Sequence, residues 1–161
     1  MINPPYIPLV PFSFTSIYSN RFQVVYSDAS LVKLGARLAY NYKNTVNVEL
    51  KGVINSWNVN SEAYAWNKPK YEAEINTNIR INPNLSVSAN AYFEGTRYAK
   101  LGNVAYLMND KLDINLGISY NYNSWLTAFA KINNLINNRY QNFYGYDVQG
   151  TNAMIGAAFT F

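Results

Sequence analysis

Three carboxylates have the spacing that acid–base chemistry requires. Glu72 and Glu74 are two residues apart in an alternating segment, so a strand places both side chains on one face, about 7 Å apart. Glu94 is expected across the hairpin from them, and Arg80 offers a counter-charge. The chain has no His and no Cys, which removes the usual components of nucleophilic triads and of zinc sites. Because no other feature indicates a sugar-cleaving cleft, we predict no enzyme, no metal site and no cofactor.

Charged side chains recur along the polar faces of the expected strands. They could line a lumen and select charged solutes, or they could only neutralise one another inside a narrow barrel, and we favour the second explanation. Arg37 is expected opposite Glu49 if the turn at 42–44 occupies three residues, which would form a favourable cross-strand pair. The predicted lumen-facing polar residues are Lys33, Arg37, Glu49, Lys51, Glu72, Glu74, Arg80, Glu94, Asp113 and Lys131.

Aromatic side chains gather in the expected long connections. They could stack on a ligand or a partner. Packing of the loops on themselves, or an aromatic belt at a membrane surface, explains them at least as well. The candidates for ligand or partner binding are Tyr64, Trp66, Tyr98, Tyr106, Phe143, Tyr144 and Tyr146.

The composition favours a membrane barrel. The 161 residues are 49% hydrophobic and 16% aromatic, yet the mean hydropathy is only −0.19. No run of eighteen apolar residues exists, which excludes a transmembrane helix. A membrane barrel combines apolar outer positions, uncharged polar inner positions and Tyr at its rims; a soluble Tyr-rich β-sandwich is the alternative. The net charge of +4 comes from scattered Lys and Arg, so we predict no nucleic-acid binding.

Alternation of apolar and polar residues predicts strands along most of the chain. The clearest is 112–122, where every even-numbered residue is apolar. Short turns at 42–44, 82–84 and 122–124 alternate with longer connections, apart from a tight one at 27–30, and this is typical of outer-membrane barrels. The expected strands are 12–26 (clearest at 21–26), 31–41, 45–57, 70–81, 85–97, 112–122, 125–133 and 149–161, after an extended Pro-rich lead-in at 1–11.

The predicted fold class is therefore all-β. We expect an antiparallel transmembrane β-barrel built as a meander of about eight strands over residues 12–161, either a closed small barrel or the C-terminal part of a larger one. The residues expected to face lipid are Ile75, Ile79, Val87, Leu116 and Ile118, and those expected to face the interior are Asn76, Asn78, Ser88, Asn115 and Ser119. A basic rim at the extracellular strand ends is expected to meet lipid phosphates through Lys68, Lys70, Arg97, Lys100, Lys111 and Arg139.

Two stretches carry a family resemblance. The ending, with Gly156, Phe159 and Phe161, resembles the C-terminal signal by which the assembly machinery reads bacterial outer-membrane barrels. Residues 133–140, followed by 145–146 and 149–150, resemble the penultimate strand and last outer loop of TonB-dependent receptors. Residues 65–69 look like a loop of such barrels from Bacteroidota, with Asn67 where His is more usual.

The resemblance implies an outer-membrane transport component of unknown substrate, the C-terminal barrel segment of a TonB-dependent-receptor-like protein. It implies a bacterial outer-membrane location and three partners: outer-membrane lipid or lipopolysaccharide, the barrel-assembly machinery acting on the C-terminal strand, and the remaining strands and plug of a larger receptor. Import in that family needs a plug and a TonB-contacting segment, and we expect this sequence to lack both. Since residues 1–5 do not resemble a signal peptide, we expect a mature form or a piece of a longer precursor. A small structural or adhesive barrel that binds a partner through its Tyr-rich loops is the second interpretation.

Overall fold

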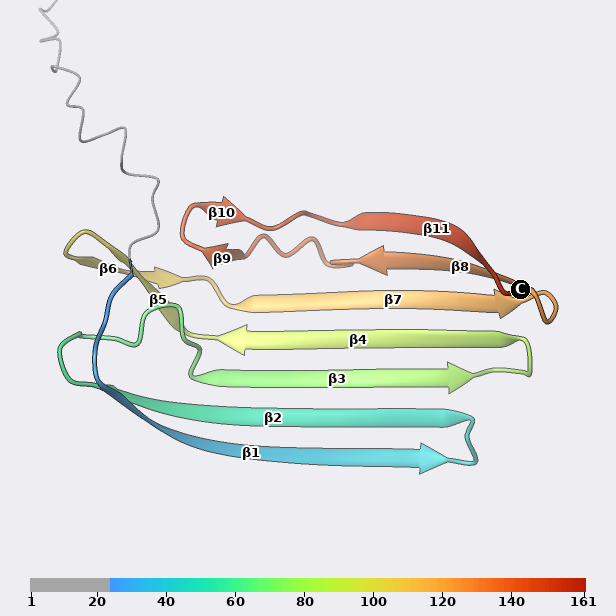
Figure 1. Ribbon diagram of the computed structural model, residues 1–161, viewed down its shortest axis with the longest axis horizontal. Coiled ribbons are helices and arrows are strands. Elements are labelled where there is room, and N and C mark those ends of the chain that lie inside the picture. The colour runs from blue at the N-terminus through green and yellow to red at the C-terminus, as the bar shows by residue number, and fades with distance from the viewer. Residues whose placement is uncertain (1–23) are drawn as a thin grey trace, which may run out of the picture.

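Residues 24–161 are described by the computed structural model, and they form one antiparallel sheet with two hairpins at one end (Figure 1). Residues 12–23 of the first expected strand and the lead-in at 1–11 lie outside the described residues. The sheet contains, in spatial order, β1 (Ala29–Tyr42), β2 (Val46–Val59), β3 (Tyr71–Arg80), β4 (Leu85–Gly95), β7 (Lys111–Asn121), β8 (Leu126–Asn133) and β11 (Asn152–Phe159). The hairpins are β5 (Arg97–Leu101) with β6 (Val104–Met108), and β9 (Gln141–Phe143) with β10 (Tyr146–Asp147).

The two faces of the sheet differ in polarity, as the alternation predicts. On one face, Val87 lies between Ile79 and Ile118, and Leu50 pairs with Ile75. On the other face, Asn90 lies between Asn76 and Asn115. We call these the apolar face and the polar face. The register therefore keeps each kind of side chain on its own side across the strands.

Three short turns join strands at one end of the sheet, which we call the turn end. They occupy 43–45, 81–84 and 122–125. In two of them an Asn side chain closes the turn: Asn82 Oδ1 accepts from the backbone N–H of Leu85 at 2.8 Å, and Asn123 Oδ1 accepts from that of Leu126 at 2.9 Å. An Asx turn of this kind explains why the second residue of both connections is Asn.

The opposite end, which we call the loop end, holds the long connections. Residues 98–109, expected to be a plain connection, contain β6 and all of β5 except Arg97, and the loop expected at 134–146 contains β9 and the start of β10. The tight connection expected at 27–30 is wrong, because β1 already begins at Ala29. The part of expected strand 12–26 that the structure describes, residues 24–26, is not in a strand.

One predicted pairing is wrong in register but right in contact. Arg37 lies opposite Lys51, and Glu49 lies opposite Ala39, because the turn occupies 43–45 rather than 42–44. Arg37 Nη2 nevertheless reaches Glu49 Oε2 diagonally, at 2.9 Å. Diagonal neighbours on antiparallel strands lie within reach of long side chains, so the ion pair survives the shift.

The sheet is open within the described residues, with β1 and β11 at its two edges (Figure 1). Each of the seven strands runs antiparallel to its neighbour, so β1 and β11 run in the same direction. Direct closure of β1 onto β11 would therefore create a parallel pair. An all-antiparallel ring that contains this sheet needs an odd number of further strands.

The sheet is a single layer without a conventional core. Among the described residues, the buried hydrophobic side chains are only Ala99, Met108 and Tyr140, all at the loop end. Large apolar side chains remain exposed along the strands, for example Leu34 at 71% and Ile155 at 85%. In water such a face would carry a large hydrophobic cost, so it requires a cover of lipid or protein. None of the described residues forms a helix that is long and apolar enough to cross a membrane.

Candidate functional site

A chain of polar contacts crosses the polar face from β1 to the last loop. Arg37 and Lys51 both contact Glu49, at 2.9 and 2.8 Å, and Lys51 Nζ lies 3.5 Å from Glu74 Oε2. Asn76 donates to Glu74 Oε1 at 2.7 Å. Of the charges expected to neutralise one another in β1, β2 and β3, Arg37, Glu49, Lys51 and Glu74 form ion pairs, whereas Lys33, Glu72 and Arg80 form none among the described residues.

Asparagine amides continue this polar chain towards the C-terminal half. Asn90 Nδ2 donates to Asn76 Oδ1 at 2.6 Å, and Asn115 Nδ2 donates to Asn90 Oδ1 at 3.3 Å. Asn115 Oδ1 then accepts from the backbone N–H of Asn134 at 3.0 Å. The side-chain amides of Asn90 and Asn115 each donate to one neighbouring residue and accept from another. The inner strands are therefore joined by side-chain hydrogen bonds as well as by backbone ones.

Each of the three carboxylates of the acid–base hypothesis is bound by neighbouring side chains. Glu72 lies directly opposite Glu94 across β3 and β4, an arrangement that would be destabilising for two unscreened charges. The Tyr92 hydroxyl lies 3.1 Å from Glu94 and 3.4 Å from Glu72, so one donor is shared between them. Asn55 also donates to Glu72, at 2.8 Å. Glu74 is held by Lys51 and Asn76, so these carboxylates act as hydrogen-bond acceptors that join the strands.

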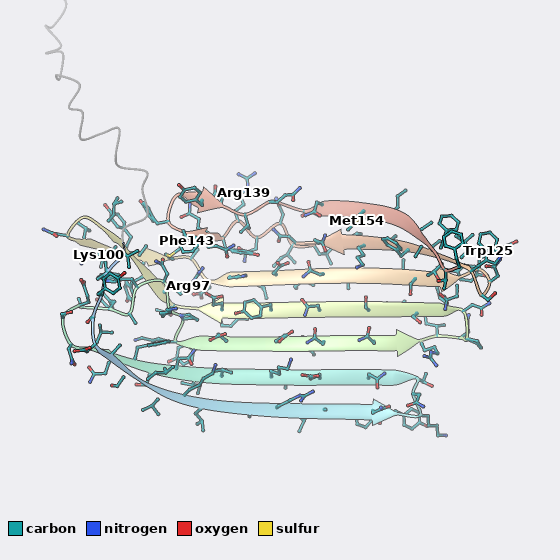
Figure 2. All side chains as sticks on the ribbon, viewed as in Figure 1. Arg97, Lys100, Trp125, Arg139, Phe143 and Met154 are labelled. Atoms are coloured by element: carbon teal, nitrogen blue, oxygen red, sulfur yellow. The ribbon has the colours of Figure 1, made fainter. Side chains whose placement is uncertain are left out.

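Arg97 connects the sheet to both hairpins. Its side chain is 3% exposed, and Nε lies 3.0 Å from Glu94 Oε1. Nη2 donates to the backbone carbonyl of Gln141 at 2.8 Å, and Nη1 lies 3.5 Å from that of Asn142. Figure 2 shows Arg97 where β4 and β5 meet, below the loop that carries Phe143. The expected role of Arg97 as a lipid-facing rim cation does not fit this burial.

Loop 60–70 is bound to the β5–β6 hairpin by charge and by stacking. Lys100 Nζ contacts both carboxylate oxygens of Glu62, at 2.6 and 2.8 Å, and the Trp66 indole N–H donates to the same carboxylate at 3.0 Å. These two hydrogen bonds, that of Lys100 first, lower the pKa of Glu62 below its usual 4.5. The ring of Tyr64 stacks on that of Tyr98, with centroids 4.0 Å apart. Lys100 is therefore also engaged within the protein.

The aromatic candidates of the loops fall into groups. Tyr64, Trp66 and Tyr98 form one cluster. Tyr106 of β6 packs on Tyr144 of the β9–β10 turn, with centroids 4.8 Å apart. The remaining two candidates, Phe143 and Tyr146, pair across β9 and β10. The loops thus pack on one another, while the side chains of Tyr64, Phe143, Tyr144 and Tyr146 stay 39–47% exposed.

Asn134 organises the last loop, a role that the sequence patterns did not indicate. It is 4% exposed and has a φ of 48°. Its Nδ2 donates to the carbonyls of Asn138 and Gln149, at 3.0 and 3.1 Å, and its Oδ1 accepts from the N–H of Asn138 at 2.9 Å. Asn tolerates the left-handed backbone conformation better than most residues, and this is the only signal that could have singled it out within an Asn-rich run.

Tyr140 and Lys111 lie beneath the same loop. The Tyr140 hydroxyl donates to Asp113 Oδ2 at 3.0 Å, and Lys111 Nζ lies 4.9 Å from the ring centre of Tyr92 and 5.0 Å from that of Tyr140. Burial, followed by the hydrogen bond to Asp113, raises the pKa of Tyr140 from 10.0 to about 12. Lys111 therefore points into the cluster rather than out to a lipid surface.

The remaining candidate residues lie at the two ends of the sheet. Lys68, Lys70 and Arg139 are at least partly exposed at the loop end. At the turn end, Phe159 stacks on Trp125 with ring centroids 5.9 Å apart, and Phe161 lies beyond β11, fully exposed. All ten residues expected to line a lumen lie on the polar face: Lys33, Arg37, Glu49, Lys51, Glu72, Glu74, Arg80, Glu94, Asp113 and Lys131.

Solved structures share this arrangement of strands. The siderophore receptor PiuA of Acinetobacter baumannii aligns with a TM-score of 0.72 and 17% identity, over 83% of this chain and 22% of its own. The ferripyoverdine receptor of the Pseudomonas aeruginosa outer membrane aligns with a TM-score of 0.72 and 14% identity, over 89% and 22%. The chain thus shares the antiparallel β-barrel fold of these receptors over part of their length.

The likeness has defined limits. The chain spans about a fifth of the length of these receptors, since the alignments cover 22% of them. A further receptor structure, FpvAI in complex with pyocin S2, aligns with a TM-score of 0.73 at 14% identity. No family model and no curated protein sequence matches the chain. At these identities the fold is what is shared.

Proposed function

We propose that this chain is the C-terminal barrel segment of a larger, TonB-dependent-receptor-like transporter in the bacterial outer membrane. The observation that carries the proposal is the open antiparallel sheet, apolar on one exposed face, which aligns with siderophore receptors over most of its own length and 22% of theirs. In this proposal the apolar face contacts lipid and the polar face lines the interior. No residue is assigned a catalytic role, and the substrate is left open.

The polar contacts support a structural role for the inner face. Arg37, Lys51, Glu49 and Glu74 satisfy one another, and the amides of β3, β4 and β7 do the same. The charges of these four residues are therefore compensated within the wall. The exposed rings of the loop end are the better candidates for first contact with a ligand.

The described strands cannot close into an antiparallel barrel by themselves, and the alignment with much longer receptors favours a larger barrel over a small one. Seven described strands leave β1 and β11 parallel to each other, so an antiparallel closure needs additional strands. Bacterial outer-membrane barrels are antiparallel with even strand numbers. The small adhesive barrel therefore remains the second candidate, and it requires one more strand between β1 and β11.

Three partners belong to the proposal. The remaining strands of the receptor would pair with β1 and β11. The assembly machinery would read Gly156, Phe159 and Phe161. Outer-membrane lipid would contact the apolar face. The rim cations that are exposed and form no ion pair among the described residues are Lys68, Lys70 and Arg139, and these would contact lipid phosphates. We also propose a Bacteroidota source, because residues 65–69 resemble a loop of such barrels.

Spin labels can test the proposal on the chain inserted in lipid. Spin labels attached to Cys at positions 75 and 118, in place of Ile75 and Ile118, should relax faster in the presence of oxygen, which dissolves in the bilayer. Labels in place of Asn78 and Ser119 should relax faster in the presence of a water-soluble relaxation agent. Retention of heat-modifiable migration in detergent gels would show that the labelled variants are folded. Equal lipid contact for the two sets of positions would refute the assignment of the faces.

A further inference from the structure

The free edge of β1 lacks a neighbouring strand among the described residues. All fourteen residues of β1 are exposed. Val32, Leu34 and Leu38 are 73%, 71% and 70% exposed, whereas Leu116 and Ile118 in the inner strand β7 are 39% and 46% exposed. The backbone groups on this edge are available for pairing with another strand.

The polar side of this edge is cationic. β1 contains Lys33 and Arg37 and no acidic residue. Arg37 is paired with Glu49 of β2, but Lys33 forms no ion pair within residues 24–161. The residue opposite Lys33 is Asn55, whose amide is bound to Glu72 and to the carbonyl of Pro69. β2 therefore offers Lys33 no counter-charge, and a strand on the free side is the remaining neighbour.

We infer that the free edge of β1 pairs with an antiparallel strand from outside these 161 residues, and that this strand carries a carboxylate next to Lys33. The inference rests on the proposed function and specifies one of its partners. The carboxylate lies directly opposite Lys33 or two residues along, the diagonal relation that already joins Arg37 to Glu49. The alternate positions of the strand are apolar, to continue the apolar face at Leu34 and Leu38.

Other occupants lack this chemistry. In a pair of β1 strands from two copies, four cations would share one seam with no acid from either strand. β11 carries no charged residue, and it runs parallel to β1. Residues 1–23 contain no Asp or Glu. None of these segments can supply the counter-charge.

Peptide binding to the lipid-inserted chain tests the inference. The two probe peptides are fourteen residues long and alternate Val with Thr. One Thr near the middle is replaced by Glu in the first peptide and by Gln in the second. Each carries a photoreactive group, so the strand that it contacts can be mapped by mass spectrometry. We expect cross-links on β1, and binding of the Glu peptide about 2- to 5-fold tighter than that of the Gln peptide at low salt.

A charge reversal provides the decisive comparison. Lys33→Glu should invert the preference, so that the Gln peptide binds more tightly. Lys43→Glu, in a short turn away from the free edge, makes the same change in net charge and should keep the preference for Glu. The inference is overturned if the inserted chain binds both peptides equally, binds neither, or is cross-linked mainly on β11. Failure of the chain to insert in lipid at all would refute the proposed function instead.

Discussion

At the scale of single residues, Gly156 has a packing role that its place in a terminal signal does not reveal. A Cβ added there would lie 2.5 Å from the ring of Phe129, on the neighbouring strand β8. The ring occupies the space above the glycine, so any side chain at 156 must displace it. Packing of the folded sheet therefore requires glycine at position 156, in addition to its place in the assembly signal that we propose.

Gly156→Ala should destabilise the folded chain by about 1–3 kcal/mol, the usual cost of overpacking. Urea unfolding in lipid vesicles, followed by tryptophan fluorescence, measures the change. Gly52→Ala is the matched control, because nothing lies within 4 Å of its added Cβ. Combining Gly156→Ala with Phe129→Leu should recover much of the loss, and absence of recovery would contradict the steric explanation.

Tyr140 should make the loop end sensitive to alkaline pH. Its pKa is raised from 10.0 to about 12, so the folded state keeps a proton that the unfolded state releases above pH 10. The stability is complete below pH 10 and falls as the pH rises from 10 to 12. Urea unfolding on either side of pH 10, followed by circular dichroism, can measure this, and Tyr140→Phe should reduce the dependence. An equal response of the variant would show that another group is responsible.

At the scale of elements, polar side chains hold the loops to the sheet and to one another. Arg97 ties β5 to the β9–β10 hairpin, Glu62 and Lys100 tie loop 60–70 to β5, and Asn134 closes the last loop. These contacts join segments that are far apart in the sequence. The loop end is therefore one connected body rather than three independent loops.

Arg97→Ala should release the β9–β10 hairpin. The change leaves Glu94 without its buried partner and frees the carbonyl of Gln141, so we expect a local loss of about 3 kcal/mol. Amide exchange at 141–147 should accelerate by about 100-fold, whereas exchange in β3 should stay unchanged. Arg139→Ala, an exposed change nearby, serves as the control. Equal protection in the two variants would argue against Arg97 as an anchor.

Acid should loosen loop 60–70. The pKa of Glu62 is lowered by Lys100 and Trp66, so its contribution to stability is present above pH 4.5 and is lost as the pH falls through the lowered pKa. With Trp57 and Trp125 replaced by Phe, the fluorescence of Trp66 should report this release. Glu62→Gln should show the loosened signal already at neutral pH. A fluorescence that does not change with pH in the parent would exclude this tether.

At the scale of the whole molecule, the sheet is incomplete by its own topology. The described strands expose an edge at β1 and another at β11, and the two edges run in the same direction. A membrane cannot satisfy free strand edges, so the isolated sheet must associate with further strands or expose unpaired backbone. This requirement agrees with alignments that cover 22% of receptor chains.

The sheet formed by residues 24–161 should therefore not form a stable pore by itself. In planar bilayers we expect no long-lived unitary conductance from a refolded chain of these residues, because direct closure of their sheet would need a parallel seam between β1 and β11. The intact receptor PiuA, reconstituted in the same way, provides the comparison for insertion efficiency. A steady, uniform conductance from the chain alone would show that it closes by itself.

The sequence alone determined most of the strands, their faces and the fold class. Period-two alternation depends only on the geometry of a single strand, and so it was enough to assign the polar and apolar positions of 70–81, 85–97 and 112–122. The fold likeness to outer-membrane receptors supports the barrel class that was predicted. Turn positions followed from Asn, whose side chain satisfies the turn locally.

Only the tertiary structure decided which side chains meet. A one-residue difference in the turn after β1 places Lys51, rather than the expected Glu49, opposite Arg37, because register depends on the exact length of every turn. The anchoring roles of Arg97 and Asn134 depend on contacts with backbone 44 and 15 residues away, which no local pattern encodes. The relative direction of β1 and β11 depends on the number of paired strands between them, which no single strand reveals. The need for further strands follows from that direction.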